Sequence, residues 1–105
     1  MLRGDVVRLI PRARAGHEQQ PPRIGVIVQS DVLSPLSTVP VAPTSQSAMA
    51  TYYRPAMTIG SATTRVLVEQ LAAVDVRRVS DPVGRVGVED MWAVDEALSR
   101  VVGLH

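Results

Sequence analysis

Short apolar blocks, separated by polar or proline-containing stretches, run through most of the chain, a pattern typical of β-strands. The first block, 5–10, is rich in β-branched residues and stops at Pro11. The second block, 23–29, is apolar with few interruptions and ends at a Ser-Asp pair, which favours a buried strand. Both blocks are therefore predicted to be strands.

A third β-prone block spans 38–42, but prolines interrupt it. Pro40 lies inside the block and Pro43 follows it. Because proline has no N–H to donate to a neighbouring strand, we expect this strand at a sheet edge or with a bulge.

The second half of the chain carries shorter strand signals. We expect a strand within 49–59, around Tyr52 and Tyr53, where aromatic residues favour extended backbone. Alternating valines predict a further strand over 65–71, and a short strand or turn is expected at 76–79.

One helix is predicted, at the C-terminal end. Glu89 and Asp90 place negative charge in its first turn, which suits the positive end of the helix dipole. Apolar residues then recur at helical spacing, and Gly103 follows as a C-cap. The expected buried face consists of Met91, Val94, Leu98 and Val101 or Val102.

These elements together predict one domain over 1–105: a mainly β fold in which a small curled barrel carries a C-terminal helix. The stretch 12–22 shows neither strand nor helix periodicity and holds Gly16 and two adjacent prolines. It is predicted to be a long loop, and loops of this length are usually functional or disordered.

Charge is spread unevenly, although the net charge is only +1. Residues 1–60 carry six arginines and three acidic residues, whereas 61–105 carry five arginines and seven acidic residues. A basic half suits a polyanionic partner, and the arginine fork matches phosphate geometry. On charge alone, an ordinary solvated surface is the favoured interpretation.

Several classes of site find no support in the composition. The chain has no cysteine, which excludes disulfides and a thiol nucleophile, and its two histidines, His17 and His105, stand far apart in sequence. No metal site and no cofactor are therefore expected. No nucleotide-binding glycine fingerprint or Gly-x-Ser-x-Gly elbow is present. Without a signal sequence or a long apolar run, we expect a cytoplasmic protein with no membrane contact.

An ordered set of fragments resembles the MazF/PemK toxins of toxin–antitoxin systems. The resemblance spans nearly the whole chain, and the order and separation of the fragments make it more specific than any one of them. Those of the first half are Arg3-Gly4-Asp5-Val6, Gly16-His17-Glu18-Gln19 followed by Arg23, Val26 to Asp31, and Pro43-Thr44-Ser45; those of the second half are Glu69-Gln70-Leu71, Val83 to Val86, and Val94 to Leu98 before a terminal Gly-Leu.

The resemblance implies an SH3-like barrel that works as a homodimer and is neutralised by a cognate antitoxin. It implies a sequence-selective endoribonuclease that cuts single-stranded RNA without metal, leaving a 2′,3′-cyclic phosphate and a 5′-hydroxyl. By resemblance, the catalytic arginine falls on Arg23 and the catalytic threonine on Thr44. The other residues that it implies for RNA binding are His17, Glu18, Gln19, Ser45 and Gln70.

Arg23 and Thr44 suit this chemistry. The 2′-hydroxyl of the RNA supplies the nucleophile, so the protein must stabilise negative charge on the phosphorane and move two protons. Arg23 can fork two donors onto the phosphoryl oxygens, and the Thr44 hydroxyl can donate to them. Arginine is a poor proton donor because its pKa stays above about 12. The acid and base roles stay open, with Glu18 or His17 as candidates.

Each of these residues also has a purely structural interpretation. Arg23 could be a surface residue at a strand end, and Thr44 could cap a turn. Tyr52, Tyr53 and Trp92 could stack on RNA bases, but packing is the commoner role and is expected for Trp92.

Two positions depart from the family's pattern. Val7 and Arg8 stand where the first strand usually carries an aromatic residue, and Ile24 follows Arg23 where proline is usual. We expect these changes to affect the groove and its base preference more than the fold.

Two other functions remain open for such a barrel. CcdB-like toxins share the fold and bind DNA gyrase without catalysis, in which case the C-terminal helix, and not Arg23, would matter. An RNA-binding barrel that lacks catalysis is the third possibility.

Overall fold

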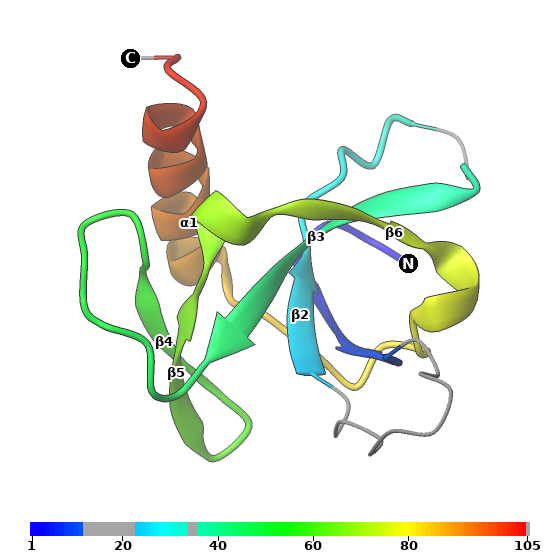
Figure 1. Ribbon diagram of the computed structural model, residues 1–105, viewed down its shortest axis with the longest axis horizontal. Coiled ribbons are helices and arrows are strands. Elements are labelled where there is room, and N and C mark those ends of the chain that lie inside the picture. Colours follow the sequence, from blue (N-terminus) through cyan, green and yellow to red (C-terminus); the bar gives the residue numbers. More distant parts are fainter. Residues whose placement is uncertain (12–22, 34–35, 105) are drawn as a thin grey trace, which may run out of the picture.

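The computed structural model describes residues 1–11, 23–33 and 36–104. This part of the chain forms seven strands, two 3₁₀ turns and one α-helix, which confirms the predicted mainly β barrel with a C-terminal helix (Figure 1). The elements are β1 (Asp5–Leu9), β2 (Arg23–Ile27), β3 (Thr38–Ser45), β4 (Ala56–Ile59), β5 (Ala62–Val66), η1 (Val68–Gln70), β6 (Ala72–Asp75), η2 (Val76–Arg78), β7 (Gly84–Arg85) and α1 (Val88–Val101).

The strands form an antiparallel sheet that curls into a nearly closed barrel. Its order is β4-β5-β3-β2-β1-β7, and β6 pairs with β3 beside that path. The chain leaving η2 returns to β1, where the Ile10 amide donates to the Arg78 carbonyl at 2.8 Å and the Ser80 amide to the Arg8 carbonyl at 3.0 Å. These bonds bring the segment after β6 against β1 and close the curl (Figure 1).

Both faces of the central strands are buried, which explains the nearly continuous apolar sequence of β2. Val26 and Ile27 are neighbours in sequence and point to opposite faces, yet they are 0% and 2% exposed. One core cluster lies among β1, β2, β3 and β6; the other lies on the opposite face, against β4, β5 and α1. The first contains Val7, Ile27, Val39, Val41 and Val74; the second is built around Val6, Val26, Val66 and Val94.

β3 is a central strand, so of the two predicted alternatives, a sheet edge or a bulge, the sheet edge was wrong. It pairs with β2, β5 and β6. Its two prolines lie where neighbouring ladders end: the Pro40 carbonyl accepts from Val28, one residue past β2, and the Pro43 carbonyl accepts from Leu67, one residue past β5. A missing N–H costs little at such positions, because no continuing strand needs it.

Two other strand predictions were wrong in their bounds. Tyr52 and Tyr53 lie in the turn before β4, so the strand of that region begins only at Ala56. Within 65–71 the strand ends at Val66 and η1 follows, while β6 was not predicted. Of the two alternatives at 76–79, the structure has a turn, η2.

The C-terminal helix is confirmed, and its end is capped as predicted. Gly103 adopts φ +79°, and the amides of Leu104 and Gly103 donate back to the carbonyls of Ser99 and Arg100 at 2.7 and 3.3 Å. These two hydrogen bonds form the Schellman motif.

The buried face of α1 is shorter than predicted. Met91 and Val94 are buried and Leu98 packs against them, but Val101 and Val102 are exposed. Trp92 is 65% exposed, so its expected packing role was wrong. No helix in the part of the chain that the structure describes is long and apolar enough to cross a membrane.

The Arg3-Gly4-Asp5 start has a structural role. Gly4 adopts φ +91°, a conformation that favours glycine; its amide donates to the Ile27 carbonyl of β2, and its carbonyl accepts from the Val86 amide, directly after β7. The buried Asp5 carboxylate accepts from Arg85 Nη1 at 2.9 Å, and Arg3 reaches both the Val28 carbonyl and the Asp95 carboxylate of α1. The motif thus ties the chain start to the sheet and the helix.

Candidate functional site

Arg23 stands at the exposed beginning of β2. Arg23 directly follows the 12–22 stretch in sequence and pairs with Leu9 of β1. Two residues later Gly25 lies so close to β3 that a Cβ there would be 2.5 Å from Val41 Cγ1. The backbone that carries Arg23 is therefore held tightly against its neighbour.

Thr44 lies near the end of β3 and is partly exposed. Its Oγ1 donates to the Ile24 carbonyl at 2.9 Å, just beyond Gly25–Pro43, the last pair of the β2–β3 ladder. The hydroxyl therefore lies beside the residue that follows Arg23, and the structure brings the two predicted catalytic positions to the same end of the barrel.

Ser45 and Gln70 lie on segments that adjoin Thr44. Ser45 pairs with Arg65 of β5, and its Oγ accepts from the Ser47 amide at 3.3 Å. Gln70 is exposed at the end of η1. The Leu67 amide, just before η1, donates to the Pro43 carbonyl at 2.8 Å, so η1 begins beside the end of β3.

His17, Glu18 and Gln19 lie outside the residues that the structure describes. Their contribution to RNA binding stays a prediction.

Sequence reasoning missed one pair of residues near this end of the barrel, Arg54 and Glu69. The Arg54 Nε donates to Glu69 Oε1 at 2.9 Å and Oε2 at 3.3 Å, and Arg54 Nη1 donates to the Met49 carbonyl at 3.1 Å. The hydrogen bond to Glu69 raises the pKa of Arg54, which keeps the guanidinium charged. Glu69 belongs to the Glu69-Gln70-Leu71 fragment, but no local pattern links it to a residue fifteen positions earlier.

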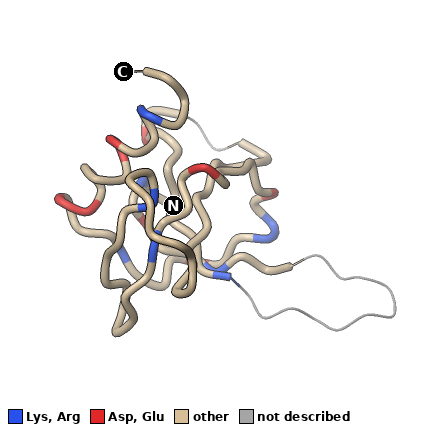
Figure 2. Tube along the Cα trace, turned by 60° about the vertical axis from the view of Figure 1, so that its left-hand side comes forward, with Lys and Arg blue, Asp and Glu red and all other residues tan. Residues whose placement is uncertain are grey.

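Among the residues that the structure describes, the uneven charge of the two chain halves does not produce a basic half in space. Figure 2 shows basic and acidic positions interspersed over the described trace. Within the described part of the chain, three ion pairs join a first-half residue to a second-half residue, because the fold brings distant segments together. They are Arg3–Asp95, Arg54–Glu69 and Arg85–Asp5.

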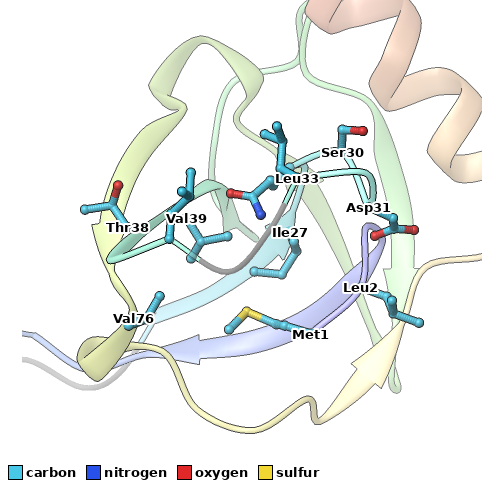
Figure 3. A pocket seen from close by; sticks show the side chains of 11 residues that line it. Met1, Leu2, Ile27, Ser30, Asp31, Leu33, Thr38, Val39 and Val76 are labelled. Atoms are coloured by element: carbon cyan, nitrogen blue, oxygen red, sulfur yellow. The ribbon is translucent and has the colours of Figure 1, made fainter.

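A separate hollow of about 350 Å³ opens at the other end of the β2–β3 ladder (Figure 3). Ile27 and Val39 form part of its wall, with the exposed Met1 and Leu33 at its rim. None of the predicted site residues that the structure describes, Arg23, Thr44, Ser45 and Gln70, lines it. The hollow and the Arg23–Thr44 end of the barrel are therefore different places.

The comparison with known proteins shows the family of the chain. A family model described as the PemK-like, MazF-like toxin of type II toxin–antitoxin systems matches residues 2–102. The chain belongs to this family. The family resemblance seen in the sequence is thereby confirmed, whereas the catalytic roles of Arg23 and Thr44 stay predictions.

Individual relatives of this toxin-family chain agree with that assignment. A Mycobacterium tuberculosis protein named "Putative toxin Rv3098A" is 35% identical and covers 99% of this chain and 99% of its own length. A mycobacterial endoribonuclease, solved in complex with its cognate antitoxin, is similar with a TM-score of 0.81 at 20% identity, over 100% of this chain and 97% of that one. MazF from Deinococcus radiodurans has a TM-score of 0.76 at 18% identity, over 98% and 96%. At such identities the two structures show the shared fold.

Proposed function

We propose that this MazF/PemK-family chain is a sequence-selective endoribonuclease that cuts single-stranded RNA without metal. The observation that carries the proposal is the Thr44 hydroxyl bound to the Ile24 carbonyl at 2.9 Å, beside Arg23. This contact supports a site in which a cation and a hydroxyl donor face one phosphate. Both can stabilise the negative charge that develops on the phosphate when the nucleophile comes from the RNA itself.

In the proposed reaction the 2′-hydroxyl oxygen attacks the adjacent phosphorus and the 5′-oxygen leaves. The products are a 2′,3′-cyclic phosphate and a 5′-hydroxyl. Arg23 stabilises the charge that develops on the phosphoryl oxygens, and Thr44 donates a hydrogen bond to the same group. One proton leaves the 2′-hydroxyl and another reaches the 5′-oxygen; Glu18 and His17 stay candidates for these transfers.

Ser45 and Gln70 are proposed to contact the RNA on either side of Thr44, and His17, Glu18 and Gln19 from the 12–22 stretch. Hydroxyl and amide groups can hydrogen-bond to base edges, which would supply the sequence preference. Substitution of Gln70 should therefore shift the cleaved sequence.

The experiment is cleavage of a single-stranded RNA by the purified protein in EDTA. Wild-type cleavage with cyclic-phosphate ends, lost in Arg23→Ala and on a substrate with a 2′-deoxy residue at the cut, supports the proposal. Arg100→Ala is the matched control, because Arg100 is an arginine of α1 paired only with Glu96 among the described residues. Unchanged cleavage by Arg23→Ala would remove Arg23 from the mechanism.

We propose a cognate antitoxin and a second copy of the chain as partners, in the cytoplasm. The mycobacterial relative solved with its cognate antitoxin supports the first. Light scattering of the purified chain tests the dimer. The antitoxin is tested by co-expressing the chain with a small acidic protein encoded by an adjacent gene, which should restore the growth of the host cells.

One observation favours the CcdB-like alternative, a toxin that binds DNA gyrase. Helix α1 presents exposed apolar side chains, among them Val88, Trp92 and Val101. A gyrase supercoiling assay separates the two functions. Inhibition by a protein that leaves RNA intact, and its loss in Trp92→Ala, would establish the alternative.

A further inference from the structure

Arg54 joins the ten-residue connection between β3 and β4 to η1. Its guanidinium donates to both Glu69 carboxylate oxygens, at 2.9 and 3.3 Å, and to the Met49 carbonyl at 3.1 Å. Its own carbonyl accepts from Arg65 Nη1 of β5 at 2.9 Å. One residue therefore connects the β3–β4 connection, η1 and β5.

The pair is sheltered from water. The side chains of Arg54 and Glu69 are 19% and 24% exposed, whereas Arg77 of the η2 ion pair is 86% exposed. Charge-assisted hydrogen bonds are stronger and more directional than neutral ones, and less screened when shielded. The Arg54–Glu69 pair can therefore hold a geometry that a surface pair cannot.

The segments so joined are those that carry the candidate RNA contacts. The β3–β4 connection begins directly after Ser45, and Glu69 immediately precedes Gln70. η1 has other attachments too: the Leu67 amide donates to the Pro43 carbonyl at 2.8 Å, Val68 is buried in the core against α1, and Leu71, directly after η1, packs against the same core. Leu67 and Val68 hold the beginning of η1 and Leu71 lies beyond its end, whereas Arg54 binds Glu69, the residue before Gln70.

We propose that Arg54 and Glu69 form a positioning pair that holds Gln70 and the backbone after Ser45 in the arrangement that cleavage requires. The inference rests on the proposed RNA cleavage and assigns the pair no contact with RNA. Because Arg54 engages both carboxylate oxygens of Glu69, we assign that carboxylate an orienting role.

The test compares Arg54→Met, Glu69→Gln and the double variant with wild type, in steady-state cleavage of one single-stranded RNA. Arg54→Met keeps the apolar stem and removes all three donated bonds. Glu69→Gln keeps the size and one carbonyl acceptor. Arg77→Met, which removes the exposed ion pair with Asp75 at η2, is the matched control.

We expect Arg54→Met to lower kcat on the order of 10- to 100-fold with KM little changed, since misplacement by about 1 Å has effects of this size. Glu69→Gln should give a smaller loss, and the double variant should be no worse than Arg54→Met alone, because both changes break one unit. Amide hydrogen exchange at Gln70 should accelerate in Arg54→Met, and Arg77→Met should match wild type.

A wild-type kcat in a folded Arg54→Met variant would overturn the positioning role. So would a double variant whose fold-loss in kcat equals the product of the two single fold-losses. If Arg54→Met does not fold, the isosteric Glu69→Gln decides: a kcat equal to wild type overturns the proposal. Absence of cleavage by the wild type itself would instead overturn the proposed function, so the two failures are distinguishable.

Discussion

The Thr44 hydroxyl donates to the Ile24 carbonyl at 2.9 Å and thereby closes the end of the β2–β3 ladder. The same proton is the one that the proposed mechanism offers to a phosphate. In the proposed mechanism, RNA must therefore compete with a backbone carbonyl for Thr44, and the bond that braces the site is exchanged for the bond to the substrate.

Replacing Thr44 separates these two roles. Thr44→Val keeps the shape but leaves the Ile24 carbonyl without its donor, which should lower the free energy of unfolding by about 1 kcal/mol. Loss of a donor to the phosphoryl group should lower kcat on the order of 100-fold. Thr44→Ser, which retains the hydroxyl, should keep most of the stability and most of kcat. Denaturant melts and cleavage assays on the two variants check this, and a fully active Thr44→Val would contradict it.

A side chain at position 25 should destabilise the fold. A Cβ there would lie 2.5 Å from Val41 Cγ1 and 3.2 Å from Leu9 Cδ1, inside a packed core. Gly25→Ala should therefore lower stability by about 1–3 kcal/mol, seen as a lower Tm. Adding Val41→Ala should cost less than the sum of the two single effects, because it removes the clashing methyl.

Gly84 provides the control for this prediction. It is also a strand glycine, but a Cβ there would meet only Val6, at an ordinary 3.7 Å. Gly84→Ala should leave Tm nearly unchanged. If Tm falls by a similar amount in Gly25→Ala and Gly84→Ala, the effect comes from the backbone preference of glycine and not from the contact with Val41.

Trp92 should contribute little to the stability of the chain. It is 65% exposed, whereas Val94, two residues further along α1, is 0% exposed. Trp92→Gln should change the free energy of unfolding by no more than about 0.5 kcal/mol, and Val94→Ala should cost about 2 kcal/mol. Acrylamide should quench the Trp92 fluorescence efficiently; a shielded tryptophan would show instead that a partner chain covers this side of α1.

The Asp75 carboxyl should titrate unusually low. The Arg77 side chain and backbone amide both donate to it and lower its pKa to about 2. A carboxyl whose pKa is lowered in the folded state stabilises the fold at pH values above its ordinary pKa, which is near 4. That contribution is lost as pH falls through about 2, so the ion pair has no effect on pH dependence near neutrality. Carbon NMR of the carboxyl measures this.

Arg77→Met should raise the pKa of Asp75 only part of the way to its ordinary value, because the backbone N–H of residue 77 still donates. An unchanged titration in this variant would show that the Arg77 side chain does not lower the pKa of Asp75.

Much of the candidate site could be named from sequence, but its support could not. Arg23 and Thr44 lie in short motifs at the ends of predicted strands, and strand ends at one edge of a barrel tend to meet. The bond from Thr44 to Ile24 could not be predicted, because it depends on β3 leaving β2 after Pro43. Arg54 and Glu69 carried no pairing signal, since their contact requires the β3–β4 connection to fold back on η1.

The sequence by itself determined the strand-rich class, the C-terminal helix and its glycine cap, because alternation, helical spacing and capping are local preferences. Only the tertiary structure decided that β3 is central despite Pro40 and Pro43, that Trp92 is exposed, and that the Thr44 hydroxyl donates to Ile24. Each of these depends on which distant segments meet when the sheet curls, and local preference does not encode that choice.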